Sequence, residues 1–222
     1  MHVHVNAATS VDGKLSTRAR EQVAISGPED FARVDRLRAA SDAVMVGVGT
    51  VLADDPSLTL DDPELRAERE ARGDPPEPAR VVADSRARTP AEARVLDDRA
   101  DTHLLVAETA PEERLAALRD ESVNVVVAGE KRVTLPAALD DLGAAGVGSL
   151  MVEGGGELIA SLFAAELVDE LTVFVGPTVI GGRDAPTLVD GEGFLDPEAF
   201  PRLALQSVDR LDGGVLLSWT VG

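Results

Sequence analysis

The segment from Ser149 to Ile159 constrains the fold of this chain more than any other. It starts as an apolar run, reaches an acid at Glu153, and continues through Gly154, Gly155 and Gly156 into apolar residues at helical spacing. Glycine accepts backbone conformations that other residues avoid, so the pattern predicts a buried strand, a tight turn and the start of a helix. The N–H groups of a helix N-terminus favour an anion such as a phosphate. A plain strand-to-helix turn is the alternative.

Apolar runs alternate with helical patterns along the rest of the chain. We expect strands at residues 2–8, 43–48, 80–83, 102–107, 123–128, up to 153, 170–175, 203–211 and 215–221. We expect helices at residues 28–40, 111–119, 135–144 and 157–165, and a short helical turn that ends near Pro56. This order predicts one α/β domain over residues 1–222, with a mostly parallel central sheet, helices on both faces and an antiparallel C-terminal hairpin. The charged stretch near residues 61–79 is expected to be a surface insertion.

Charge and composition exclude several classes of partner. The net charge is −19, and only two of the 21 basic residues are lysines. Such a chain repels nucleic acid and anionic membranes, because both bind through Lys and Arg. Acidity spread along the whole chain favours a salt-rich cytoplasm. No apolar run approaches the roughly 20 residues of a membrane span, and the N-terminus does not resemble a secretory signal. We therefore expect a cytoplasmic protein.

Metal sites and the common nucleotide motifs are not found. With no cysteine and three scattered histidines, no metal site is expected. The run Gly47-Val48-Gly49 begins a dinucleotide-binding fingerprint, but Leu52 stands where the third glycine is needed. The phosphate-binding loop of kinases and ATPases and the Gly-x-Ser-x-Gly turn of serine hydrolases are also absent.

Five segments in the same order resemble the riboflavin-biosynthesis pyrimidine reductases. They are residues 6–14, 47–59, 82–86, 152–156 and 176–182. The block Thr-Val-Leu-Ala-Asp-Asp-Pro followed later by Glu-Gly-Gly-Gly is specific to this resemblance. The resemblance implies a dihydrofolate-reductase-like fold, NADPH as cofactor and a homodimer. Without cysteines the chain cannot hold the zinc site of a fused deaminase, so the resemblance implies a free-standing reductase.

The resemblance also implies a reaction and a set of cofactor-binding residues. The expected reaction reduces the ribosyl side chain of 2,5-diamino-6-(ribosylamino)-4(3H)-pyrimidinone 5′-phosphate to the ribityl form. Ser85 and Arg86 follow a strand and would hold the adenosine 2′-phosphate, where arginine binds well. Val133 would cover the adenine. The full set of expected cofactor residues is Ala8, Thr50, Asp54, Ser85, Arg86, Val133, Gly154, Gly155, Gly156 and Glu157.

Four residues are expected at the substrate, namely Ser26, Arg38, Leu58 and Glu153. Arg38 is the candidate for the substrate phosphate, and a solvated arginine at a helix end is its alternative. Glu153 is the one expected catalytic residue, because an acid there could bind the pyrimidine or manage a proton. Bacterial members carry a lysine where this chain has Asn6 and an arginine where it has Asp61. Phosphate recognition is therefore partly unassigned.

Two other functions remain open from the sequence. One is an NADPH reductase of another heterocycle, such as a folate or pterin. The other is a non-catalytic nucleotide-binding protein that kept the fold. Turnover of a pyrimidine substrate would distinguish the pyrimidine reductase from both alternatives. It would also show whether the substrate is the aminated or the deaminated pyrimidine.

Overall fold

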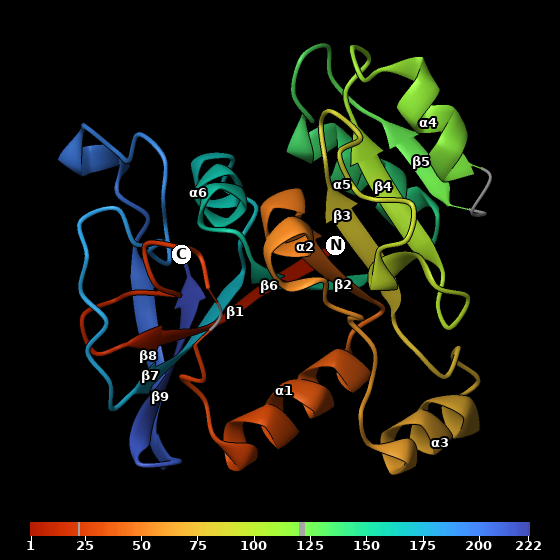
Figure 1. The fold of residues 1–222 in the computed structure, drawn as a ribbon. Helices are drawn as coiled ribbons and strands as arrows, with labels where there is room; N and C mark the ends of the chain where they lie inside the picture. Colours follow the sequence, from red (N-terminus) through yellow and green to blue (C-terminus); the bar gives the residue numbers. More distant parts are fainter. Residues whose placement is uncertain (22, 120–122) are drawn as a thin grey trace. The chain divides into compact units, whose positions relative to one another are not determined.

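A computed structural model describes residues 1–21, 23–119 and 123–222 (Figure 1). The chain divides into two compact units. The unit that we call central comprises residues 35–151 and Met1, and the unit that we call terminal comprises residues 2–34 and 152–222. Two elements, α1 (Pro28–Ala40) and β6 (Ser149–Gly154), begin in one unit and end in the other. The prediction of a single domain over residues 1–222 stays a prediction.

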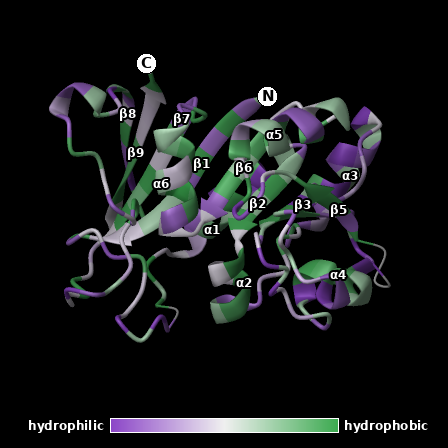
Figure 2. Cartoon of the chain, turned by 90° about the horizontal axis from the view of Figure 1, so that it is seen from above, coloured by the Kyte–Doolittle hydropathy of each residue, from purple (hydrophilic) through white to green (hydrophobic). Residues whose placement is uncertain are grey.

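The central unit is built on four parallel strands in the order β5-β4-β3-β2. They are β2 (Ala43–Gly47), β3 (Ala79–Ala83), β4 (Thr102–Val106) and β5 (Asn124–Val127). Except at β5, these strands are almost entirely buried, as expected of parallel strands covered on both faces. Helices α4 (Glu112–Arg119) and α5 (Leu135–Ala144) lie on opposite sides of the strands (Figure 2).

The terminal unit contains strands in the order β1-β7-β9-β8. They are β1 (His2–Ser10), β7 (Glu170–Gly176), β8 (Leu203–Leu211) and β9 (Gly214–Val221). β1 and β7 are parallel, whereas β9 runs antiparallel to both β7 and β8. The turn between β8 and β9 has positive φ at both Asp212 and Gly213, which is the hairpin turn that an Asp-Gly pair favours. The expected C-terminal hairpin is confirmed.

The charged stretch near residues 61–79 contains a helix that the sequence analysis did not predict. Helix α3 (Pro63–Arg72) begins at Asp62, whose side chain accepts a hydrogen bond from the Glu64 N–H, and ends at Gly73 with φ +90°. These are ordinary signals for helix ends. The sequence patterns did not indicate this helix because it has no apolar stripe, and the expected surface insertion stays a prediction.

An arginine holds α3 in place instead. Arg69 is buried at 3% exposure and donates to the carbonyl oxygens of Ala39, Ser41 and Pro75, each at 2.8 Å. Burial lowers the pKa of its guanidinium. Hydrogen bonds to three carbonyls compensate for removing this charge from water.

The observed order of elements confirms the expected α/β class. The two remaining helices are α2 (Val48–Asp54) and α6 (Gly156–Ala164), and two 3₁₀ turns lie at Arg94–Leu96 and Pro197–Ala199. Within the described ranges, none of these helices is long and apolar enough to cross a membrane.

Candidate functional site

Three loops meet at the carboxyl ends of β3, β4 and β5 in the central unit. The Val133 N–H donates to Ser85 Oγ at 3.0 Å, which joins the loop after β3 to the loop after β5. The Glu108 N–H donates to the Gly129 carbonyl oxygen at 2.9 Å, which joins the loops after β4 and β5. Ligands of α/β proteins commonly bind outside the carboxyl ends of the strands. The structure thus brings together two of the expected cofactor residues, Ser85 and Val133.

A buried acid shapes the loop that carries Ser85 and Arg86. Asp84 is fully buried, and its Oδ2 accepts hydrogen bonds from the N–H and the hydroxyl of Thr89 at 2.7 and 2.8 Å. Ala87, inside the loop, has φ +50°, a conformation that a non-glycine residue adopts only under constraint. The loop is therefore held in one shape, and Arg86 is exposed on it.

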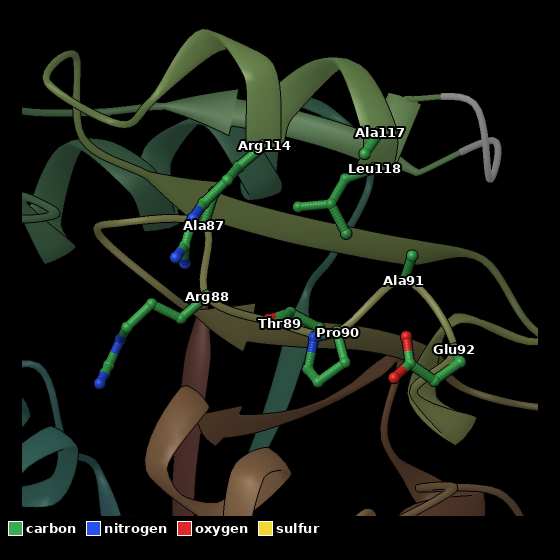
Figure 3. A pocket seen from close by; sticks show the side chains of 9 residues that line it. All are labelled: Ala87, Arg88, Thr89, Pro90, Ala91, Glu92, Arg114, Ala117 and Leu118. Carbon is green, nitrogen blue, oxygen red and sulfur yellow. The ribbon is translucent and has the colours of Figure 1, made fainter.

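Two hollows lie beside this loop. One, of about 350 Å³, is lined by Arg86, Arg88, Thr109, Pro111 and Arg114. The other, of about 380 Å³, shares Arg88 and Arg114 with the first, and Figure 3 shows the side chains that line it. Three of the five residues that line the first hollow are arginines, and none is an acid.

Helix α2 carries two further expected cofactor residues. Helix α2 follows β2 directly, and Thr50 and Asp54 lie one turn apart on it. Residues four apart share one helix face. Partial burial raises the pKa of the Asp54 carboxyl. The two side chains can therefore act on the same ligand.

Two expected substrate residues, Leu58 and Arg38, lie in the segment after α2 and on α1, respectively. Leu58 has φ +54° and is buried at 2% exposure. Arg38, near the end of α1, is half-buried, and its guanidinium donates to the Thr59 carbonyl oxygen at 3.0 Å. The alternative of a merely solvated helix-end arginine is therefore weakened. Contact of either residue with a substrate stays a prediction.

The glycine turn in the terminal unit has the expected strand, turn and helix geometry. β6 ends at Gly154, Gly155 has φ +99°, and α6 starts at Gly156. A Cβ at position 156 would lie 2.5 Å from the Thr187 carbonyl oxygen and 2.7 Å from Asp190 Oδ2. Glycine is therefore required at both positions, by backbone conformation at Gly155 and by packing at Gly156.

The other expected residues of the terminal unit lie on β1, β6 and α6. Glu153, half-buried, directly precedes the glycine turn, and Glu157 is exposed in the first turn of α6. Ala8 is half-buried on β1, in register with Phe174 of β7. An acid in the first turn of a helix is stabilised by the helix dipole.

Ser26 belongs to a polar network that the sequence analysis missed. Its hydroxyl donates to Asp30 Oδ2 at 2.5 Å, and Arg33 donates through Nε to Asp30 Oδ1 at 2.8 Å. Arg33 also donates to Asn6 Oδ1 at 2.8 Å. Asn6, one of the two expected departures from the family pattern, thus accepts a hydrogen bond from the Arg33 guanidinium. The acid and the base three residues apart in the helical pattern were the signal that could have revealed this pair.

The exposed carboxylate of Asp12 links residues 6–14 to residues 176–182 through hydrogen bonds. Asp12 accepts hydrogen bonds from the Ser10 hydroxyl at 2.6 Å and from the N–H groups of Ile180 and Gly181 at 3.0 and 2.7 Å. The hydrogen bond from Ser10 is the largest cause that lowers the pKa of Asp12 to about 2. These bonds favour the charged form of the carboxyl group.

We expect the folding stability to depend on pH through the ionisation of Asp12. Because the pKa of Asp12 is lower in the folded protein than in the unfolded chain, its charged carboxylate stabilises the fold at pH values above the unfolded pKa of about 4. This stabilisation is lost as the pH falls through the folded pKa of about 2. The melting temperature of Asp12→Asn should lie below that of the parent near pH 5, and the difference should vanish near pH 2. Asp98→Asn, which changes an exposed acid outside this turn, serves as the control. A difference that is constant across this pH range would contradict the assignment.

The three histidines lie on strands, His2 and His4 on β1 and His103 on β4. His4 Nε2 is hydrogen-bonded to Thr172 Oγ1 at 2.8 Å, and burial lowers its pKa. His2 lies 3.6 Å from Asp169, and His103 is half-buried on β4. Across the described ranges, no group of three or more His, Asp or Glu side chains is placed to hold a metal ion.

The expected cofactor and substrate residues are divided between the two units. The central unit contains Arg38, Thr50, Asp54, Leu58, Ser85, Arg86 and Val133. The terminal unit contains Ala8, Ser26, Glu153, Gly154, Gly155, Gly156 and Glu157.

Comparison with known proteins identifies the family. Residues 1–217 match the RibD C-terminal domain. The chain belongs to the RibD C-terminal domain family. It is 50% identical over 213 residues to the 2,5-diamino-6-ribosylamino-4(3H)-pyrimidinone 5′-phosphate reductase of Archaeoglobus fulgidus, covering 96% of this chain and 94% of that one. The reductase of the same name from Methanothermobacter thermautotrophicus is 46% identical over 220 residues, covering 99% and 98% of the two chains.

A solved structure shares the fold of this RibD-family chain. The pyrimidine reductase-like protein of Corynebacterium diphtheriae superposes with a TM-score of 0.87, covering 99% of this chain and 91% of that one. The sequence identity of that pair is 19%, so this likeness concerns the fold alone. The expected family and fold are confirmed.

Proposed function

We propose that this chain is the NADPH-dependent reductase that converts the ribosyl side chain of 2,5-diamino-6-(ribosylamino)-4(3H)-pyrimidinone 5′-phosphate to the ribityl form. One observation carries the proposal: the chain is 50% identical, over nearly its full length, to an archaeal reductase named for this substrate. The glycine turn and the Ser85–Val133 pair support it from the structure, since both are local arrangements that suit a phosphorylated nucleotide.

The residues present fit a nicotinamide cofactor. Gly155 and Gly156 carry no side chain where the chain enters α6, and backbone N–H groups there would approach a pyrophosphate. Thr50 and Asp54 share a face of α2 and would hold the cofactor there. When bound, NADPH supplies the hydride.

The protein's own part in the reaction is to position the two reactants and to manage a proton. Reduction of the ring-opened ribosyl group, as the imine, adds one hydride to C1′ and one proton to the nitrogen. We assign the proton to the Glu153 carboxyl, the expected acid at the end of β6. Arg38 would bind the substrate phosphate.

A cofactor-oxidation experiment tests the proposal. The pure protein is mixed with NADPH and either the aminated or the deaminated pyrimidinone phosphate, and the nicotinamide absorbance is followed. We expect oxidation with the aminated substrate. Tight NADPH binding without turnover of either substrate would instead favour a non-catalytic nucleotide-binding protein. Turnover of a folate or pterin alone would favour a reductase of another heterocycle.

We also infer that the protein works best in high salt. The net charge of −19 produces strong self-repulsion, which salt screens because the Debye length shrinks to about 3 Å at 1 M. The melting temperature and the NADPH oxidation rate should both rise from low to molar potassium chloride. A melting temperature that is flat over this range would contradict the inference.

The proposed assembly is a homodimer in the cytoplasm. β8 is the last strand of its sheet, and its side chains Leu203, Leu205 and Val208 are exposed at 41%, 56% and 58%. An exposed apolar edge strand favours association with a second chain. Sedimentation of the parent protein and of Leu205→Lys should give a dimer and a monomer, respectively.

A further inference from the structure

We propose that Asp30 is a positioning residue that makes Ser26 a pure hydrogen-bond acceptor, so that Ser26 binds an N–H or O–H group of the substrate rather than its phosphate. This rests on the proposed function for the identity of the ligand. Asp30 lies in the first turn of α1, four residues after Ser26, and both residues belong to the terminal unit. Ser26 is an expected substrate residue, whereas the resemblance assigns no role to Asp30.

The direction of the hydrogen bond between the two side chains is the first argument. Ser26 Oγ lies 2.5 Å from Asp30 Oδ2, a distance typical of a hydroxyl that donates to a charged carboxylate. A charged carboxylate only accepts hydrogen bonds, whereas a serine hydroxyl has one proton to donate and two lone pairs. The single hydroxyl proton of Ser26 is therefore committed to Asp30. A ligand that contacts Ser26 meets lone pairs, so the ligand must supply the proton.

The charge on Asp30 is the second argument. Arg33 Nε and Nη2 lie 2.8 and 2.7 Å from Asp30 Oδ1, and Nη2 also donates to Asn6 Oδ1 at 2.8 Å. Asp30 and Asn6 are only 1% and 5% exposed, so this ion pair is largely removed from water. Protonation of Asp30 would leave the guanidinium without its counter-charge, which is costly in such surroundings. Arg33 therefore keeps Asp30 in the charged form that can only accept.

The main chain that carries Asp30 is also held in place. Asp212, in the turn between β8 and β9, accepts the Asp30 N–H at 2.7 Å and the Glu29 N–H at 3.2 Å. These are N–H groups at the start of α1 that have no partner within the helix. A Cβ at Gly27 would lie 2.5 Å from Asp212 Cγ, so glycine permits this close approach. Contacts of both backbone and side chain thus hold the Asp30 carboxylate against Ser26.

The difference in exposure assigns the two roles. Asp30 is buried, whereas Ser26 is half-buried, so a ligand can reach the serine but not the acid behind it. A phosphate dianion presents only acceptors, and the lone pairs of Ser26 and the charge of Asp30 both repel it. The amino groups of the pyrimidine and the hydroxyl groups of the ribosyl chain present donors. The substrate group that faces Ser26 is therefore an amino or a hydroxyl group.

A double-mutant cycle tests the positioning role. Ser26→Ala should raise KM for the aminated pyrimidinone phosphate roughly two- to tenfold, the range for one uncharged hydrogen bond, and leave kcat within a few-fold. Asp30→Asn should raise KM similarly, because a proton of the amide can occupy a lone pair of Ser26. The combined variant should match Ser26→Ala alone, because Asp30 acts through Ser26. Losses in KM that multiply would overturn the proposal.

The matched control is an exposed serine and acid on β8. The Ser207 hydroxyl donates to Asp209 Oδ2 at 2.9 Å. Ser207→Ala and Asp209→Asn remove the same kind of hydrogen bond and the same charge, and both should keep the parental KM. NADPH affinity, measured by fluorescence titration without substrate, should equal that of the parent in all variants. A loss of NADPH affinity in Asp30→Asn would show a structural role and contradict the proposal.

Two further measurements need no substitution at Asp30. Neutron diffraction from crystals of the parent should place the hydroxyl deuteron of Ser26 between Oγ and Asp30 Oδ2, and a deuteron that points away would refute the proposal. The increase in KM on Ser26→Ala should persist with a substrate that lacks the 5′-phosphate. Its disappearance would mean that Ser26 binds the phosphate. If the deuteron is in place but no pyrimidine is reduced, the proposed function fails and the orientation of Ser26 stands.

Discussion

Glu153→Gln should lower the rate of hydride transfer by about 10²–10⁴-fold, the range for the loss of a general acid or base. The amide keeps the shape of the side chain and one carbonyl acceptor, but it cannot carry a charge or release a proton at neutral pH. NADPH affinity should stay within a few-fold, because the glycine turn rather than Glu153 is expected to hold the cofactor. Single-turnover measurements separate the chemical step from binding.

Glu153→Gln also tests a purely structural role. A lost hydrogen bond at the end of a strand would cost roughly 0.5–1.5 kcal/mol of stability and leave turnover near that of the parent. Glu198→Gln, which changes an exposed acid of the terminal unit, controls for the removal of one negative charge. Parental turnover with only a lowered melting temperature would make Glu153 structural.

Gly156→Ala should both destabilise the protein and weaken cofactor binding. The added methyl group would lie 2.5 Å from the Thr187 carbonyl oxygen and 2.7 Å from Asp190 Oδ2, so the segment around residues 187–190 must move. Overpacking of this kind costs about 1–3 kcal/mol, which lowers the melting temperature by about 2–4 °C per kcal/mol in a chain of this size. Movement at the start of α6 should also lower NADPH affinity by roughly tenfold, or about 1.4 kcal/mol.

Gly143→Ala is the matched control for this steric argument. Gly143 lies in α5, its φ is not positive, and a Cβ there would meet no atom within 4 Å. Alanine is the better helix former, so Gly143→Ala should raise stability by about 0.5–1 kcal/mol. The steric account would be wrong if the two variants melted at the same temperature. The assignment of the turn to the cofactor would be wrong if Gly156→Ala kept parental NADPH affinity.

Much of the fold could be predicted from the sequence because its signals are local. The strand, the glycines and the helix of residues 149–164 follow from apolar patterning and backbone freedom, and the Asp212-Gly213 turn follows from positive φ at both positions. The family prediction rested on five segments in a fixed order, and the match over residues 1–217 confirms it. The individual site residues stay predictions.

Helix α3 shows where local patterning fails. Its buried residue is Arg69, and arginine in a charged segment predicts exposure. Burial became favourable because three carbonyl oxygens, on segments distant from it or beyond the end of its helix, converge on its guanidinium. Arg80 is a similar case: it is 0% exposed on β3 and donates to Thr102 Oγ1 and to Asp97 Oδ1.

The sequence by itself determined the α/β class, the family and the glycine turn, because each depends on residues close together in the chain or on the order of several motifs. The expected cofactor and substrate residues stay predictions. The tertiary structure alone decided which side chains meet. It joined Val133 to Ser85, bound Asn6 to Arg33, and brought Arg114 of α4 to the same hollow as Arg86 and Arg88. The physical reason is that hydrogen bonds and charge clusters depend on distances in space, which chain spacing does not encode once several strands and helices lie between the partners.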